Sequence, residues 1–245
     1  MRAPLLAALA CLALSACAGP RAILRPDAAA ASARSASARA ASTPAEARAR
    51  AFLAVTERVE PVAERECRRR NPAGVDCDLR IVVDDRPGMP PNAFQTVDRR
   101  GRPILGITVA LIEAAFNEDE MAFVLAHEAS HHALGHLRRQ DEVASLGAEI
   151  FGRLAAGDPG ATPASVRQAR ELGAAVGARS YSKDWELEAD ALGAVIAQGA
   201  GYDPLRGADF FLRIPDPGER VLGTHPANAE RIAVVRAVVS GALVP

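Results

Sequence analysis

The amino-acid sequence predicts an α+β fold that is mainly helical, with a small sheet placed before one central helix. Short β-type runs bounded by turn residues occur between positions 79 and 108, whereas helical periodicity and capping motifs dominate the rest of the chain. With 245 residues, of which 49% are hydrophobic, the chain suffices for one globular core. Its net charge of -1 offers no electrostatic basis for a nucleic-acid partner, so we expect none.

The first residues have the form of an export signal. An apolar run at residues 5–14 follows a charged start and is too short for a lasting membrane-spanning helix. It ends in Leu14-Ser15-Ala16-Cys17, which resembles the lipobox of bacterial lipoproteins. The resemblance implies a signal peptide at residues 1–17, cleavage before Cys17 and a lipid anchor on its sulfur. By resemblance to enterobacterial sorting, Ala18 favours the outer membrane, facing the periplasm; an ordinary signal peptide with an incidental cysteine is the alternative.

Residues 18–43 predict a tether between the lipid and a folded domain. Positions 28–42 contain only Ala, Arg and Ser, which cannot bury enough apolar surface to fold alone. Thr43-Pro44-Ala45-Glu46 is a capping box with proline at the first helical position. A helix should therefore open a folded domain at residues 44–245, with Pro61 allowing a kink or break in it.

Cys67 and Cys77 are the cysteines outside the signal and the lipid site. In an oxidising compartment two such residues, around a turn at 71–74, favour a disulfide that pins a helix end to the following strand. A cysteine metal site is disfavoured because neither has a second Cys or His nearby. Two free buried thiols are the remaining alternative.

Three short strands are expected next. Residues 79–83 predict a strand that ends at the turn-rich residues 84–88, and residues 92–97 and 104–108 predict two more around a turn at 98–102. This small sheet precedes the central helix. An exposed edge of it could accept an extended polypeptide as an added strand.

The central helix carries a metal-binding pattern. A short helix is expected at 109–116, and Asn117 is typical of the cap of the next helix. In that helix His127 and His131 lie four residues apart on one face, so both imidazoles can reach one metal ion. Glu128 lies beside them as a base that can take a proton from water. This H-E-x-x-H order is typical of zinc hydrolases.

A third ligand has to come from later in the chain, because a catalytic zinc usually keeps three protein ligands. The metzincin arrangement would need glycine at position 134 and histidine at 137, but the chain has Leu134 and Leu137. Glu186 and Asp190 share a face of a predicted helix, and Glu188 points about 200° away on standard geometry. Glu186 is therefore the predicted ligand, and Asp190 would accept the free ring N–H of a ligand histidine. An exposed acidic helix face is the alternative.

Helices are predicted through the second half of the chain. Capping residues and glycine stops place them at residues 142–156, 163–180, 184–199, 204–213 and 226–240. His132 and His136 would form an i, i+4 pair rotated by about 100° from the ligand face. We expect this pair in surface or core packing rather than at a second metal ion.

Three segments together resemble the zinc metallopeptidases grouped with HtpX and the CAAX prenyl protease, in particular their periplasmic lipoprotein members. They are His127-Glu128-Ala129-Ser130-His131, Glu186-Leu187-Glu188-Ala189-Asp190 and Thr224-His225-Pro226. The resemblance implies a gluzincin-type, zincin-like metalloprotease domain. It also implies one zinc ion (Zn2+) per chain, bound by His127, His131 and Glu186, with Glu128 as general base.

His225 precedes Pro226 near the cap of the last predicted helix, where the positive helix end disfavours imidazolium. As a catalytic group, a neutral imidazole there could stabilise the oxyanion of the tetrahedral intermediate, or it could gate the open position of the zinc. A capping or packing histidine is the alternative to both.

The function predicted from these features is a zinc-dependent endopeptidase, lipid-anchored in the bacterial envelope, that hydrolyses unfolded or misassembled envelope proteins. Its expected partners are an extended polypeptide substrate, the membrane and the envelope assembly machinery. A non-proteolytic, chaperone-like lipoprotein that uses zinc to hold its fold is the alternative, and Glu128 argues against it because a structural zinc needs no base. The hypothesis that the protein hydrolyses a non-peptide bond of the cell wall has less support, since no part of the sequence resembles a glycan-binding module.

Overall fold

The computed structural model describes residues 43–71, 74–180, 182–216 and 226–245. From Thr43 to the C-terminus these residues form one unit, mainly helical with a small sheet, so the predicted α+β class is confirmed. The predicted signal peptide with Cys17 and the tether up to residue 42 lie outside the described residues, as does His225.

Helix α2 (Pro44–Arg70) starts at the predicted capping box. The Thr43 hydroxyl accepts a hydrogen bond from the Glu46 backbone N–H, and the Glu46 carboxylate accepts one from the Thr43 N–H. These bonds satisfy two donors at the helix end. The helix continues through Pro61, because buried apolar residues on both sides of the proline, Val59 and Val62 among them, hold it against the core.

Three strands of the described chain form a sheet in the order β1-β3-β2. β1 (Arg80–Asp84) pairs parallel with β3 (Pro103–Thr108), and β2 (Ala93–Val97) pairs with β3 antiparallel. The β2–β3 turn is held by the Asp98 carboxylate, which accepts hydrogen bonds from two backbone N–H groups. The central strand β3 is largely buried, and both of its neighbours are edge strands of this sheet.

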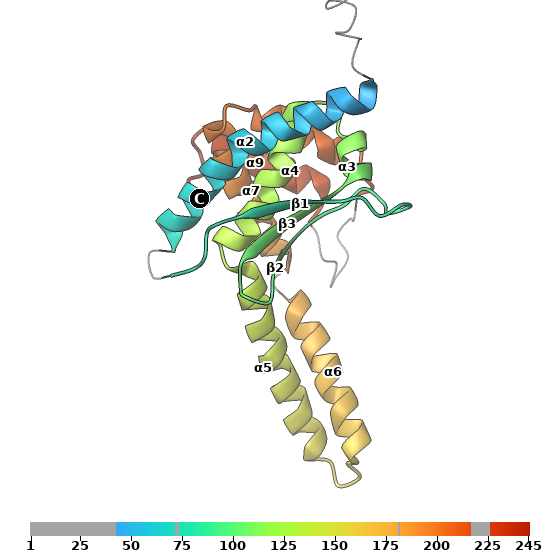
Figure 1. Ribbon diagram of the computed structural model, residues 1–245. Coiled ribbons are helices and arrows are strands. Elements are labelled where there is room, and N and C mark those ends of the chain that lie inside the picture. Colours follow the sequence, from blue (N-terminus) through green and yellow to red (C-terminus); the bar gives the residue numbers. More distant parts are fainter. Residues whose placement is uncertain (1–42, 72–73, 181, 217–225) are drawn as a thin grey trace, which may run out of the picture. The chain divides into compact units, whose positions relative to one another are not determined.

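Helix α4 (Glu118–Ala133) is the buried centre of the unit (Figure 1). It follows the short helix α3 (Val109–Ala114), and the Asn117 side chain caps it by accepting a hydrogen bond from the Glu120 N–H. Helix α2, the edge strand β2 and helix α7 (Ser182–Gly199) all pack against it. Several polar side chains of α4 are therefore buried, among them Glu120, His127 and Ser130.

Beyond α4 the chain forms a helical hairpin. Gly135 adopts a positive φ of 69° and ends α4. Helices α5 (His136–Ala156) and α6 (Pro163–Arg179) then lie antiparallel and project away from the other helices (Figure 1). Their backbones approach closely, since a Cβ added to Gly147 would lie 2.1 Å from the carbonyl oxygen of Gly173.

The last helices return to the core. Instead of the single helix predicted at 204–213, α8 (Pro204–Ala208) is followed directly by a 3-10 turn, η1 (Asp209–Leu212), and then by α9 (Asn228–Val239). The change of helical geometry brings Phe211 into edge-to-face contact with Phe123 of α4, with ring centroids 5.7 Å apart. Tertiary packing, which the local pattern does not contain, thus decides the form of this segment.

Candidate metal centre

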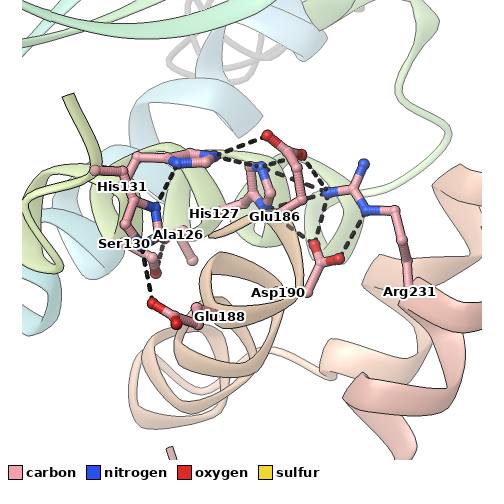
Figure 2. Close-up of polar contacts among 9 residues, drawn as sticks. Ala126, His127, Ser130, His131, Glu186, Glu188, Asp190 and Arg231 are labelled. Atoms are coloured by element: carbon pink, nitrogen blue, oxygen red, sulfur yellow. Dashed lines mark hydrogen bonds and ion pairs between the residues drawn. The ribbon is translucent and has the colours of Figure 1, made fainter. Parts of the chain in front are cut away.

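Two helices bring His127, His131 and Glu186 together. The histidines stand one turn apart on α4, and Glu186 comes from the N-terminal part of α7 (Figure 2). The two Nε2 atoms are 3.1 Å apart, and Glu186 carboxylate oxygens lie 3.5 Å from Nε2 of His127 and 3.4 Å from Nε2 of His131. Within the described residues, these three side chains form a group whose ligand atoms all lie within 4.8 Å of one another.

This donor set fits a zinc ion. Two imidazole nitrogens and one carboxylate are a known ligand set of catalytic zinc, which keeps a further position open. Both Nδ1 atoms face other partners, and the Nε2 atoms are the ring nitrogens that converge with the Glu186 carboxylate. The three side chains are only 10–17% exposed, and converging lone pairs at such a buried place are costly unless a cation joins them.

A glycine in α7 lets the two helices meet at this point. A Cβ added to Gly193 would lie 3.1 Å from the backbone nitrogen of His127 and 3.2 Å from its Cα. A larger side chain would therefore push α7 away from α4. Glu186 and Asp190 precede Gly193 by seven and three residues on the same helical face, so this contact sets their distance from the histidines.

Behind His127, Asp190 joins the site to α9. Asp190 is fully buried, and its Oδ1 lies 2.9 Å from His127 Nδ1. Both of its oxygens accept hydrogen bonds of 2.7 Å from the Arg231 guanidinium (Figure 2). Arg231 also lies 3.4 Å from Glu186 and 3.9 Å above the Phe211 ring. One arginine therefore supplies positive charge to two buried carboxylates.

No sequence motif identifies Arg231 as a residue of the site. It lies on the buried face of α9 together with Asn228 and Val235. In the sequence, the indication of a buried role was a charged residue at a position of this otherwise buried face. That signal is weak, because long arginine side chains often lie along a buried face with their heads in water. Only the packing of α9 against α7 shows that the guanidinium turns inward.

The charges around His127 decide its protonation. Burial lowers the pKa of the imidazole, but its hydrogen bonds with Asp190 and Glu186 outweigh burial and raise the pKa to about 10. Burial also lowers the pKa of Arg231, and the contact with Asp190 reverses this and raises it. The site therefore favours a cation at His127, and metal binding has to displace the proton because both compete for the same nitrogen.

His131 has a histidine as its neighbour. His136 Nδ1 lies 2.8 Å from His131 Nδ1, and His136 Nε2 lies 3.2 Å from the Glu188 carboxylate. Glu188 also accepts a hydrogen bond from Arg139. Burial first, and then the charge of His131, lower the pKa of His136 to about 4, although Glu188 opposes this shift. His136 is therefore a neutral imidazole in contact with the metal-binding group.

His132 and His136 are both buried, which agrees with the predicted packing role, but the prediction that they form an i, i+4 pair on one helix is wrong. The left-handed conformation of Gly135 ends α4, so the two histidines belong to different helices. His132 lies instead with its Nε2 2.7 Å from the backbone carbonyl oxygen of Asp76. Of the two, only His136 touches the metal-binding group.

Glu128 faces a cleft of about 700 Å³ between the metal-binding group and the sheet. Residues 91–95, which lead into and along the edge strand β2, line one side of this cleft. Its apolar lining comes from several elements and includes Phe94, Leu111, Val124, Phe210, Phe211 and Ile214. A base, a metal-binding group and an edge strand thus share one opening.

Two further predicted residues lie elsewhere. Cys67 and Cys77 are buried and joined by a disulfide, with their Cα atoms 5.8 Å apart, between the end of α2 and the segment before β1. Neither lines the cleft. His225 belongs to residues 217–225, which lie outside the described part of the chain, so its expected position near the metal stays a prediction.

Comparison with known proteins places this geometry in a family. Residues 52–239, well over half of the 245-residue chain, match the family described as Peptidase family M48. The chain belongs to peptidase family M48. The resemblance to the HtpX-like zinc metallopeptidases is thereby confirmed. M48 peptidases are zinc metalloproteases, and the matched region contains the whole His-His-Glu group.

Curated relatives of this M48 domain include proteins named beta-barrel assembly-enhancing protease. The one from Yersinia pestis is 33% identical over 144 residues, which are 52% of this chain and 29% of that protein. The one from Escherichia coli strain K12 is 31% identical over 143 residues, 52% of this chain and 28% of that protein. A putative one from Vibrio cholerae is 31% identical over 134 residues, 48% and 27% respectively. The chain thus spans less than a third of the length of these relatives.

Replacing Arg231 tests its part in the metal centre. Arg231→Met should lower the free energy of unfolding by about 3–5 kcal/mol, because it removes the guanidinium that donates to both oxygens of the buried Asp190 carboxylate. Urea unfolding followed by circular dichroism measures this loss. Arg236→Met, at an exposed position on the same helix, is the matched control and should cost much less. Equal losses in the two variants would show that the Asp190–Arg231 pair contributes little.

Proposed function

We propose that this M48 family member is a zinc-dependent endopeptidase that cleaves unfolded or misassembled proteins of the bacterial envelope. The supporting observation is that Glu128 lines the same cleft as His127, His131 and Glu186. A site that only stabilised the fold would be closed by a fourth protein ligand and would need no base beside it. The open cleft and the base together favour hydrolysis.

In this proposal His127, His131 and Glu186 hold one zinc ion. When bound, zinc supplies Lewis-acid chemistry, which makes water nucleophilic near neutral pH and polarises the scissile carbonyl. Glu128 takes the proton of the attacking water and passes it to the leaving amine. Asp190 accepts the Nδ1–H of His127, which keeps the Nε2 lone pair directed at the ligand group.

The substrate in this proposal is a polypeptide in extended conformation. Among the described strands β2 pairs only with β3, so its outer backbone groups can bind an extended chain as an added strand. Backbone pairing does not depend on the substrate sequence, which suits a protease of unfolded proteins. His225 is proposed as a second catalytic group that either stabilises the oxyanion or gates the zinc.

We also propose an envelope location, with a lipid on Cys17 as the anchor and residues 18–43 as the tether. Among the described residues, no helix has both the length and the apolar character needed to cross a membrane. The relatives named for enhancing β-barrel assembly support the outer membrane as the place and its assembly machinery as a partner.

Substitution of the base tests the chemistry. Glu128→Gln should retain stoichiometric zinc, because Glu128 is not a ligand, yet lose cleavage of an unfolded protein by at least about 100-fold, the lower range for a positioned base. Casein cleavage with and without a chelator, together with zinc analysis, measures both effects. Wild-type rates in the variant would sink the mechanism. A wild-type chain that binds zinc but cleaves nothing would favour the chaperone-like alternative.

Two carboxylates of α7 provide a matched test of the ligand set. Glu186→Ala should lose zinc, because it removes one of three ligands, whereas Glu188→Ala should still bind one zinc ion per chain. Zinc content after dialysis against a weak chelator distinguishes the variants. Loss of zinc from the Glu188 variant alone would show that the ligand assignment is reversed.

The lipid anchor can be tested in a bacterial host. Cys17→Ala should move the protein from the membrane fraction to the soluble periplasmic fraction, because the acylated sulfur is lost. Cys11→Ala, within the same signal segment, is the control and should leave the protein in the membrane fraction. A wild-type protein that is already in the soluble fraction would argue for an ordinary signal peptide, and a Cys17 variant that stays in the membrane fraction would show that the lipid is not the anchor.

A further inference from the structure

His136 touches the metal-binding group from behind. Its ring is only 4% exposed and stacks on Trp185, with ring centroids 5.8 Å apart and an angle of 19° between the planes. Its Nδ1 lies 2.8 Å from Nδ1 of His131, and its Nε2 lies 3.2 Å from a Glu188 carboxylate oxygen. The imidazole is thus held by stacking and engaged at both nitrogens.

The hydrogen bonds that run from His131 through His136 to Glu188 have one consistent assignment of ring protons once His131 is a metal ligand. A neutral imidazole that offers its Nε2 lone pair to a metal carries its proton on Nδ1. The His131 Nδ1–H must then donate to His136 Nδ1, which has to be the lone-pair nitrogen of that ring. The single proton of His136 is therefore on Nε2, where it donates to Glu188.

We propose that His136 is a positioning residue that fixes the tautomer and the ring orientation of His131. The proposal rests on the proposed function in one respect, the assignment of His131 as a zinc ligand. The arrangement parallels that of His127, whose Nδ1 lies 2.9 Å from Asp190. Each ligand histidine then has its own partner, a carboxylate of α7 for one and the first residue of α5 for the other.

The local backbone explains how His136 reaches this position. The left-handed Gly135 turns the chain at the end of α4, so His136 faces back towards His131. Glu188 lies on the side of α7 that faces α5, and Arg139 donates a hydrogen bond of 3.1 Å to it. Arg139 therefore holds the Glu188 carboxylate in place as the acceptor for His136.

Substitutions at position 136 separate the hydrogen bond from packing. Leucine and asparagine have similar shapes, but only asparagine carries an oxygen near the place of Nδ1 that can accept the His131 proton. His136→Leu should weaken zinc binding by about 10- to 100-fold, the usual effect of losing such a partner, and His136→Asn should stay within about threefold of wild type. Competition with a chromophoric chelator on the full chain measures the affinities.

His132→Leu is the matched control. His132 is also buried and also bonded through a ring nitrogen, but to the backbone oxygen of Asp76 and not to a ligand. It should therefore keep wild-type zinc affinity. Equal affinity of His136→Leu and wild type, or equally weak binding by the leucine and asparagine variants, would overturn the proposal.

Nitrogen-15 NMR of the zinc-loaded wild-type chain gives a second test that does not depend on the stability of a variant. His131 should carry its ring proton on Nδ1, and His136 should carry its proton on Nε2. Protonation of His136 on Nδ1 would overturn the proposal. A wild-type chain that binds no zinc would instead overturn the proposed function, and this inference with it.

Discussion

The approach of α7 to α4 at Gly193 is the contact on which the candidate site depends. Backbone meets backbone there, because Gly193 has no side chain to hold the helices apart. The same face of α7 carries Asp190 and Glu186, which lie behind and beside the ligand nitrogens of His127. A side chain at the crossing would move Glu186 away from both histidines. The spacing of the two helices therefore decides whether the three side chains can share a metal ion.

Burial increases the free-energy cost of leaving any polar group around this crossing without a partner. A buried charge is costly unless it is paired and hydrogen-bonded, and Asp190 meets that condition through Arg231. The same solution recurs at the start of α4, where the Glu120 carboxylate, 1% exposed, is paired with Arg213. Both arginines come from the C-terminal part of the chain, so that segment completes the electrostatics of helices formed much earlier in the sequence.

The hairpin α5–α6 separates the two halves of the site along the chain without separating them in space. A long connection adds little to the entropy cost of bringing its ends together, and the close glycine contacts between Gly147 and Gly173 give the hairpin an interface of its own. Its first residue, His136, nevertheless lies against the metal-binding group. The hairpin therefore packs on itself along its length and contacts the metal-binding group at its base.

Features that depend on residues close together in the chain could be predicted from the amino-acid sequence. Thr43 and Asn117 predict helix starts through capping bonds to residues three positions on, and the spacing of His127 and His131 places both rings on one helical face. Motif order then led to Glu186. The helix starts and the histidine spacing could be predicted because each rests on interactions within about one helical turn.

Contacts between distant segments set the roles of Arg231 and His136 and divide the 204–213 segment into α8 and η1. Arg231 lies 41 residues from its carboxylate partner, and no local pattern carries that pairing. The position of His136 depends on the left-handed conformation of Gly135. Because this residue ends α4, His136 contacts His131 and does not continue the helix of His132. Burial, which makes these contacts strong, is a property of the whole fold and not of any segment.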